Sequence, residues 1–148
     1  MKIILQRVLQ ANLKIDDQLI AEINKGIVAF IGVAREDTIL EIHQQADKIC
    51  NLRIFNDNNK KMNQSLMEIN GDILIISQFT LYANCKKGNR PSFINAAPPE
   101  HAKKIYNEFV NYMNNKTTKV QTGQFGADMQ VSLINDGPAT FILDTNAT

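Results

Sequence analysis

The sequence predicts an α+β domain in which a mixed, mostly antiparallel sheet curls toward a barrel and two main helices pack on its outside. Two runs, Gly26–Val33 and Ile73–Leu81, are largely apolar, as in strands that are buried on both faces. Two longer segments, which begin at Thr38 and at Pro98, place apolar residues three and four apart, the helical period. The order is strands, helix, strands, helix, strands without a repeat or linker, so we expect a single domain over residues 1–148.

Composition describes a soluble globular protein of a reducing compartment. The 148 residues are 44% apolar and 21% charged. No apolar run reaches the roughly 20 residues that cross a bilayer, and the N-terminus does not resemble a signal peptide. Cys50 and Cys85 make neither a disulfide framework nor a metal-ligand spacing, so we expect a cytoplasmic protein with no membrane partner, no cofactor and no metal. A net charge of +1 argues against a protein that coats nucleic acid, although it leaves room for a local basic patch.

The N-terminal third is predicted to form strands. Residues Lys2–Val8 alternate as a strand does. Asp16-Asp17 provides a hairpin turn between Leu13–Ile15 and Gln18–Ile23, since Asp tolerates turn geometry. The apolar run Gly26–Val33 follows as a central strand.

The first helix has a clear start signal. Thr38-x-x-Glu41 is a capping box, in which each side chain bonds the other residue's backbone N–H. His43 falls on the polar side and is expected to be solvated rather than a catalytic base. Cys50 is expected to be a small buried hydrophobe beside the core-facing stripe. That stripe consists of Ile39, Ile42, Ala46 and Ile49.

The second helix is predicted to start at Pro98-Pro99, because proline is well tolerated in the first turn. His101 lies in this first turn and is expected to be exposed. The apolar face of the helix consists of Ala102, Ile105, Tyr106, Phe109, Val110 and Met113.

Further strands are expected between and after the helices. Ser65–Ile69 is a candidate strand, and Asn70-Gly71 is a strong hairpin signal that would lead into Ile73–Leu81. Tyr82–Ala97 is too polar and irregular for an element, and it is long enough to be functional. The expected C-terminal segments are the strands Lys119–Thr122, Asp128–Ile134 and Ala139–Leu143, followed by a frayed end at Asn146–Thr148.

Two polar interruptions of apolar strands are the candidate site. The run Ile73–Leu81 acquires hydrogen-bonding side chains at Ser77, Gln78 and Thr80 without a Gly or Pro to end it. A buried strand must satisfy such groups or use them on a ligand, unless the strand simply ends there in a loop. Near the C-terminus, Asn135–Thr140 has the composition of a hairpin turn.

This second segment has features beyond a simple turn. Gly137-Pro138 lies between strands apolar enough to be central, where proline is normally excluded. A Gly-Pro bond can also be cis at modest cost, which would direct two consecutive carbonyl groups the same way.

The two segments, SQFTL and NDGPAT, resemble those of the D-aminoacyl-tRNA deacylase family. The resemblance runs from Met1 to Asp144 without a large gap. It also includes QRV at the start, NLRIF, KMNQS, KGNRPSF, APPE and TGQFGADMQVSL. It implies a homodimeric enzyme that hydrolyses the ester bond of D-aminoacyl-tRNA and releases the D-amino acid. Because rejection of L-amino acids by steric exclusion acts on the side chain, which glycine lacks, we expect glycyl-tRNA to be hydrolysed as well.

The resemblance also implies roles for residues of the two polar segments. Gly137-Pro138 matches a Gly-cis-Pro dipeptide that enters the partner subunit's pocket and rejects L-amino acids, and Arg7 matches an arginine near it. The residues matching the motif around the 3′-terminal adenosine and the ester are Ser77, Gln78, Phe79 and Thr80.

The basic loop is where this sequence departs from the family pattern. Lys86, Lys87 and Arg90 fall in a loop expected to meet tRNA phosphates. Asn84-Cys85 stands where a more polar or acidic pair is common in the family, and the catalytic motifs keep the family pattern.

The expected chemistry relies on positioning rather than on a strong base. An aminoacyl ester is already activated, and the sequence offers no Ser-His-Asp or Cys-His arrangement. The backbone N–H groups around Phe79 and Thr80 are the expected oxyanion donors, and a water helped by the terminal 2′-hydroxyl of the tRNA is the expected nucleophile. Thr80 would then be a positioning residue. Two alternatives stay open: a small-ester hydrolase that uses Thr80, and a non-catalytic RNA-binding module.

Overall fold

The computed structural model describes residues 1–117 and 119–145, and at Pro138 the backbone alone. The expectation of a frayed end at Asn146–Thr148 lies outside the described residues. Among the described residues, the helices are all too short or too polar to cross a bilayer.

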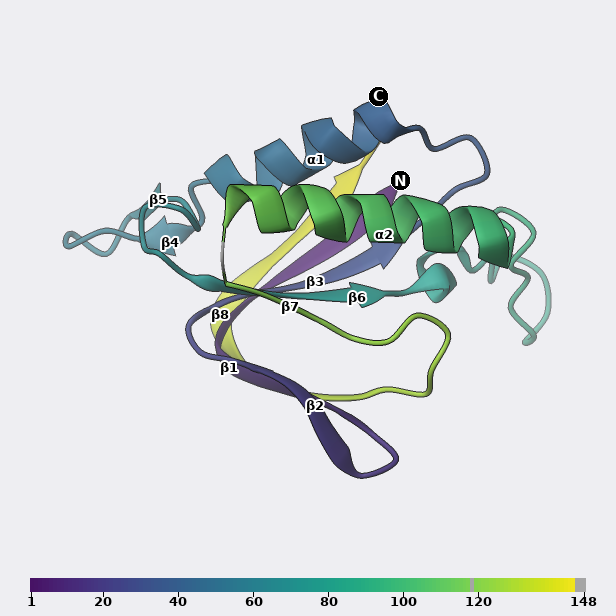
Figure 1. Ribbon diagram of the computed structural model, residues 1–148, viewed down its shortest axis with the longest axis horizontal. Coiled ribbons are helices and arrows are strands. Elements are labelled where there is room, and N and C mark those ends of the chain that lie inside the picture. The colour runs from purple at the N-terminus through teal and green to yellow at the C-terminus, as the bar shows by residue number, and fades with distance from the viewer. Residues whose placement is uncertain (118, 146–148) are drawn as a thin grey trace.

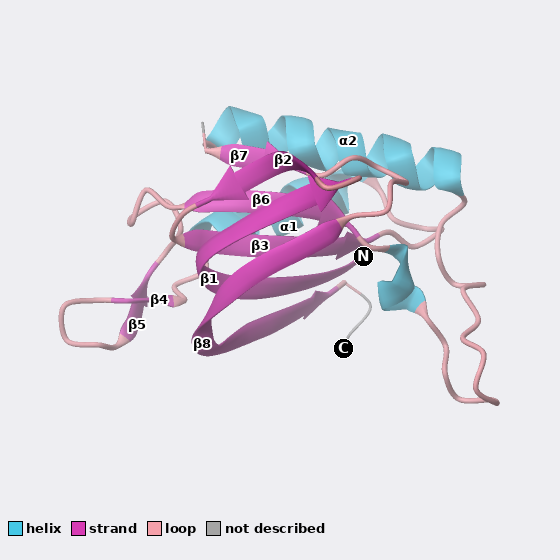
Figure 2. Ribbon diagram, turned by 90° about the horizontal axis from the view of Figure 1, so that it is seen from below, coloured by secondary structure: helices cyan, strands magenta, loops and turns pink. Residues whose placement is uncertain are grey.

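A six-stranded mixed sheet forms the centre of the molecule and confirms the predicted fold class (Figures 1 and 2). Its order is β2-β1-β3-β6-β7, and β8 pairs with β1. The pairs β3–β6 and β6–β7 are parallel, and the three pairs made by β1 are antiparallel. The strands are β1 (Lys2–Ile15), β2 (Gln18–Ile23), β3 (Gly26–Gly32), β6 (Asp72–Ser77), β7 (Val120–Thr122) and β8 (Gln130–Asp144).

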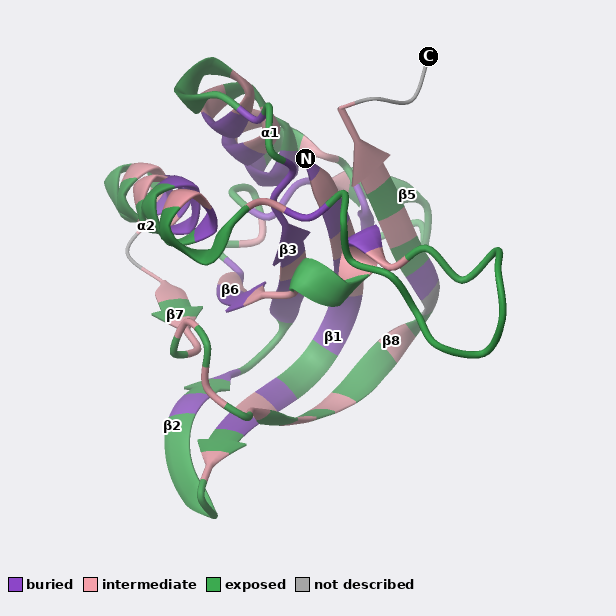
Figure 3. Cartoon of the chain, turned by 90° about the vertical axis from the view of Figure 1, so that its right-hand side faces the viewer, coloured by how far each residue is buried: buried purple, intermediate pink, exposed green. Residues whose placement is uncertain are grey.

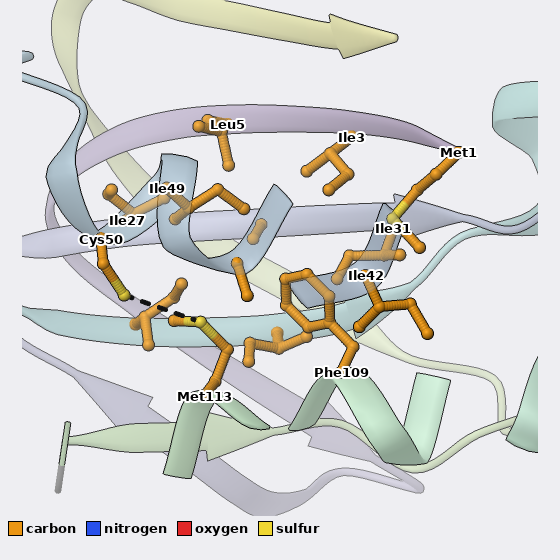
Figure 4. Packing of buried hydrophobic residues seen from close by; sticks show 14 of the residues in the cluster. Met1, Ile3, Leu5, Ile27, Ile31, Ile42, Ile49, Cys50, Phe109 and Met113 are labelled. Carbon is orange, nitrogen blue, oxygen red and sulfur yellow. Dashed lines mark hydrogen bonds between the residues drawn. The ribbon is translucent and has the colours of Figure 1, made fainter. Parts of the chain in front are cut away.

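Two helices, α1 (Ile39–Asn51) and α2 (Pro99–Lys116), lie side by side on one face of this sheet (Figure 1). The main core fills the space between them and the strands (Figure 4). A smaller cluster, around Leu13, Ile23 and Leu74, fills the opposite side where the sheet curls. The arrangement leaves much of β8 and the β1–β2 hairpin uncovered by helices (Figure 2).

The predicted helix signals are confirmed, with one exception. The capping box is present: the Thr38 N–H donates to Glu41 Oε2 at 2.7 Å, and Thr38 Oγ1 accepts from the Glu41 N–H at 3.5 Å. Ile39 is 46% exposed, because it occupies the first helical position, before α1 packs on the core. Cys50 is buried as predicted, and burial raises the pKa of its thiol.

The predicted strand Ser65–Ile69 is wrong. This segment forms a helical turn capped like α1, since the Ser65 N–H donates to Glu68 Oε2 at 2.6 Å and Ser65 Oγ accepts from the Glu68 N–H at 3.2 Å. Asn70 has φ 50°, so Asn70-Gly71 closes this turn instead of forming a hairpin. The strand that precedes it, β5 (Met62–Gln64), pairs with the short β4 (Phe55–Asn56).

The two predicted C-terminal strands are one strand. Because β1 continues from Lys2 to Ile15, β8 pairs with it on both sides of the Asn135–Thr140 segment. In the register, Gln6 faces Thr140 and Val8 faces Asn135, so Arg7 alone stands opposite residues 136–139. The segment predicted as a turn is therefore a wide bulge, a place where a strand tolerates a proline that cannot donate to the ladder.

Candidate active site

A pocket of about 710 Å³ opens where β3 and β6 end, below the start of α2. Ser77, Gln78 and Phe79 line it, as do Phe93 and Met129. Most of the wall is apolar, and its polar side chains are Ser77 and Gln78 at the end of β6 together with Arg35 and Asp128. This combination is typical of a small-molecule site, in which apolar walls bury the ligand and a few polar groups orient it.

The end of β6 forms the polar edge of the pocket. The Gln78 N–H still donates to the Ile31 carbonyl at 2.7 Å, and the chain then turns into a 3₁₀ helix, η1 (Phe79–Tyr82). The prediction of a strand through Leu81 is therefore wrong by four residues. The polar residues mark the strand end, and the first N–H groups of η1 have no partner within that helix.

Gln78 and Thr80 are joined at this edge. Gln78 Nε2 donates to Thr80 Oγ1. Ser77 and Gln78 are half-buried, whereas Thr80 is exposed and lies just beyond the pocket wall. Among the described residues no histidine or carboxylate contacts Thr80 Oγ1, so no general base is placed to activate it.

The two histidines lie elsewhere. His43 is half-buried rather than solvated: its ring stacks on Tyr112 with centroids 4.0 Å apart, and Nε2 lies 3.3 Å from Glu108 Oε1. His101 is also half-buried, where exposure was expected. Neither histidine lines the pocket.

The predicted basic loop begins and ends beside the pocket mouth. Asn84 and Ser92 exchange backbone hydrogen bonds of 2.8 and 3.0 Å at its base, and Phe93 follows directly. Phe93 meets Phe79 edge-on with ring centroids 5.0 Å apart. The loop between Asn84 and Ser92 projects from the molecule and is exposed throughout (Figure 3). It carries Lys86, Lys87 and Arg90.

Arg7 and the Gly137 bulge meet at a second place. Arg7 is only 4% exposed, and its Nε lies 3.0 Å from the Asp136 carbonyl oxygen and 3.1 Å from Asp136 Oδ2. Its Nη1 donates to the Ile54 carbonyl. A buried guanidinium thus ties the bulge to the segment that leads into β4, while Gly137 itself stays exposed.

Within one chain, the described side chains of the bulge do not reach the pocket. Arg7 pairs with Ile27 at the start of β3, whereas the pocket lies past Ile31 at the end of that strand. Neither Arg7 nor Gly137 belongs to the pocket wall. The predicted site residues therefore form three groups: one at the end of β6, one on the exposed basic loop, and one at the middle of the β1–β8 pair.

Comparison with known proteins decides the family. The family model described as D-Tyr-tRNA(Tyr) deacylase matches residues 4–144. The chain belongs to this family. It is 51% identical over 145 residues to the D-aminoacyl-tRNA deacylase of Thermosipho africanus, covering 98% of this chain and 97% of that one. The D-aminoacyl-tRNA deacylase of Desulfatibacillum aliphaticivorans is also 51% identical, over 98% of this chain and 99% of its own.

Solved structures share the fold. The structure named c-Myc DNA Unwinding Element Binding Protein superposes with a TM-score of 0.94 at 39% identity, covering 99% of this chain and 100% of that chain. A probable eukaryotic D-amino acid tRNA deacylase superposes with a TM-score of 0.84 at 19% identity, covering 96% and 97%. The second likeness concerns the fold alone.

Part of the pocket wall in this member of the D-Tyr-tRNA(Tyr) deacylase family was not predicted from the sequence. Pro98, Phe125 and Met129 line the pocket, and Phe93 forms its aromatic edge with Phe79. The signal that could have found them was present, because all lie in stretches that carried the family resemblance.

Proposed function

We propose that this protein hydrolyses the ester bond of D-aminoacyl-tRNA and releases the D-amino acid and the tRNA. The observation that carries the proposal is the pocket at the end of β6, lined by Ser77, Gln78 and Phe79 in a chain of the D-Tyr-tRNA(Tyr) deacylase family. A volume of about 710 Å³ suits a terminal nucleoside with its aminoacyl group.

In the proposed reaction, the backbone N–H groups of Phe79 and Thr80 stabilise the negative charge that develops on the ester carbonyl oxygen. Water attacks the carbonyl carbon, the bond to the ribose oxygen breaks, and the proton lost by the water reaches that oxygen through the neighbouring 2′-hydroxyl. Thr80, held by Gln78, positions the reacting groups. A small-ester hydrolase with Thr80 as nucleophile fits less well, because no base contacts the described Thr80 hydroxyl.

Selection of D over L substrates is assigned to Gly137-Pro138 of a partner subunit, whose bond is proposed to be cis. The bulge lies outside its own chain's pocket, so an intermolecular role gives it access to a site. A thousandfold preference takes about 4 kcal/mol, which a rigid backbone wall can supply by steric exclusion. Because this wall excludes a side chain rather than recognising one, glycyl-tRNA would also be hydrolysed.

The proposed partner surface is the β1–β8 pair. Within the described chain β8 is paired with β1 alone, and exposed apolar side chains gather on these strands: Leu9, Ile134 and Ile142. A second copy of the chain would cover them in a homodimer. We assign the tRNA phosphates to the exposed basic loop, which carries Lys86, Lys87 and Arg90. We propose a cytoplasmic location, because tRNA is the substrate.

The decisive experiment is a deacylation assay with matched D-tyrosyl-, L-tyrosyl- and glycyl-tRNA, combined with light scattering at micromolar concentration. We expect D-tyrosyl-tRNA and glycyl-tRNA to be hydrolysed and L-tyrosyl-tRNA to stay intact. Light scattering should give the mass of a dimer. Binding of tRNA without hydrolysis would favour the RNA-binding alternative. Equal turnover of D-tyrosyl esters that lack tRNA would favour the small-ester alternative, and a fully active monomer would overturn the cross-subunit assignment.

A further inference from the structure

A second cleft of about 320 Å³ lies next to the proposed active-site pocket. It is lined by Lys2, Arg35, Glu36, Tyr82, Ile94, Asn95 and Asp144. The two hollows share Arg35 and the wall between them. In η1, Phe79 borders the first hollow and Tyr82 the second; in the following loop, Phe93 and Ala96 border the first, while Ile94 and Asn95 border the second.

Tyr82 is the feature of this cleft that the fold does not explain. The residue is 7% exposed, and its hydroxyl has no hydrogen-bond partner among residues 1–117 and 119–145. Buried hydroxyl groups are normally bonded, because an unmade hydrogen bond costs the desolvation of the group. Burial and the nearby carboxylate of Asp37 raise the pKa of Tyr82, so the hydroxyl stays protonated and can donate. Because Tyr82 lines the cleft, a ligand with an acceptor group there would supply the missing partner of this buried donor.

The charges of the cleft favour a nucleotide over a simple anion. Lys2 and Arg35 are opposed by Glu36 and Asp144, so the lining is balanced rather than strongly basic. Lys2 Nζ lies 5.2 Å from the centre of the Tyr82 ring and 3.8 Å from Asp144 Oδ2, which leaves it partly neutralised. A nucleotide carries one phosphate together with neutral donors and acceptors on its sugar and base, a mixture that matches this lining.

Arg35 is held at the boundary between the hollows. Its Nε donates to the Ile94 carbonyl at 3.2 Å, and Ala34 forms a β-bridge with Ala96 beside it. A guanidinium anchored through Nε still presents its terminal N–H groups, which suit a phosphate. The guanidinium therefore stands where a chain passing from one hollow to the other would place its linking phosphodiester.

We propose that this cleft binds the nucleotide that precedes the terminal one at the tRNA 3′ end, with Arg35 on the linking phosphodiester and the Tyr82 hydroxyl donating to the nucleotide. The inference rests on the proposed function, because the first pocket must hold the terminal aminoacyl-nucleoside. It adds a second nucleotide subsite within a single chain, separate from the exposed basic loop.

The test compares three substrates of increasing length: D-tyrosyl-adenosine, D-tyrosyl-cytidylyl-adenosine and D-tyrosyl-tRNA. For the wild type, we expect kcat/KM to rise at least tenfold from the nucleoside to the dinucleotide ester, mainly through KM. Arg35→Ala should bring the ratio of the two kcat/KM values, dinucleotide ester over nucleoside ester, close to one. Tyr82→Phe should lower this ratio about three- to tenfold. The melting temperature of Tyr82→Phe should not fall, because the deleted hydroxyl leaves no group of the described chain without its partner.

Arg53→Ala is the matched control. Arg53 lies by the β4–β5 hairpin, at the opposite end of the molecule from η1 (Figure 1), and its variant should leave the ratio unchanged. The inference is overturned if the wild type shows no gain from the second nucleotide. It is overturned equally if Arg35→Ala and Tyr82→Phe keep this gain in kcat/KM. The same holds if they lower kcat/KM by the same factor for the nucleoside ester and the dinucleotide ester. A wild type that hydrolyses none of the three substrates overturns the proposed function and the inference with it.

Discussion

Arg7 and Asp136 are joined at two atoms of the aspartate: Arg7 Nε lies 3.0 Å from the Asp136 carbonyl oxygen and 3.1 Å from its Oδ2. The contact connects a buried side chain of β1 to the residue that precedes Gly137. The four-residue bulge in β8 thus has a rigid base, even though it lacks regular ladder partners. A wall built of backbone needs such a base if it is to exclude a side chain by steric contact.

Arg7→Lys should loosen this base. A lysine cannot reproduce the fork that bonds both Asp136 and the Ile54 carbonyl, so we expect the free energy of unfolding to fall by about 2 kcal/mol. Hydrolysis of L-tyrosyl-tRNA should become measurable while D-tyrosyl-tRNA is still cleaved. Urea unfolding and paired deacylation assays measure the two effects. Arg53→Lys, an exposed control, should change neither, and unchanged stability with intact discrimination in Arg7→Lys would count against this role.

Gly137→Ala tests whether the bulge enters another site. A Cβ at Gly137 would lie 2.9 Å from the amide nitrogen of Asn135, an exposed side chain that can move aside. We therefore expect a melting temperature close to that of the wild type. Deacylation of D-tyrosyl-tRNA should nevertheless fall at least tenfold, because the new methyl group would project into the partner's pocket.

The double variant Asn135→Ala/Gly137→Ala separates the two possible causes. If the loss came from the clash with Asn135, removing that side chain would restore activity. If the methyl group occupies the partner's pocket, the double variant stays slow. Wild-type activity in the single variant would remove the bulge from the site altogether.

Thr80 is expected to position rather than attack. Thr80→Ala should slow single-turnover deacylation by less than about tenfold, whereas loss of a covalent nucleophile costs several orders of magnitude. Thr80→Tyr should abolish the reaction by obstructing the pocket mouth next to Phe79. An inactive Thr80→Ala protein, or an acyl-enzyme trapped on the wild type, would identify Thr80 as the nucleophile.

The exposed loop is expected to contribute affinity. Replacing Lys86, Lys87 and Arg90 together by Ala should weaken tRNA binding and reduce the slope of log K against log salt by about 0.7–0.9 for each phosphate that the loop no longer neutralises. Turnover at saturating tRNA should stay within about twofold. Filter binding over a range from about 50 to 200 mM salt measures the slope.

A triple variant of equal charge serves as the control for that measurement. Lys14, Lys25 and Lys48 are exposed and lie outside the loop, and their replacement by Ala removes the same three charges. If both triple variants change the slope equally, the effect is one of net charge, and the phosphates are not held by the loop.

Local features of the sequence were enough to predict much of the fold. The Thr38–Glu41 box and the apolar stripes determine where α1 and α2 begin and which faces they bury, because both depend on residues within a few positions of one another. The apolar runs at β3 and β6 likewise identify the central strands. The polar residues after Ile76 marked the edge of the pocket, although the sequence did not predict that the chain forms the 3₁₀ helix η1 there.

Where local signals allowed two outcomes, the tertiary structure decided. Ser65-x-x-Glu68 has the same box pattern as Thr38-x-x-Glu41, and the side-chain caps formed there instead of strand pairing. The Asn135–Thr140 segment has turn composition, yet β1 extends past it and pairs on both sides, so it remains a bulge within β8. A turn and a bulge use the same residue types, and only a distant partner strand distinguishes them.

The sequence by itself determined the helices, the central strands and the family, since these depend on local periodicity and on motifs that are contiguous in the chain. Tertiary structure alone decided which residues act together. Arg7 meets Asp136 across 129 positions, and Phe79 meets Phe93 only because the loop closes at Asn84 and Ser92. Such contacts arise when packing of the whole domain offsets the entropy of ordering the chain between them, and no short window of sequence contains that balance.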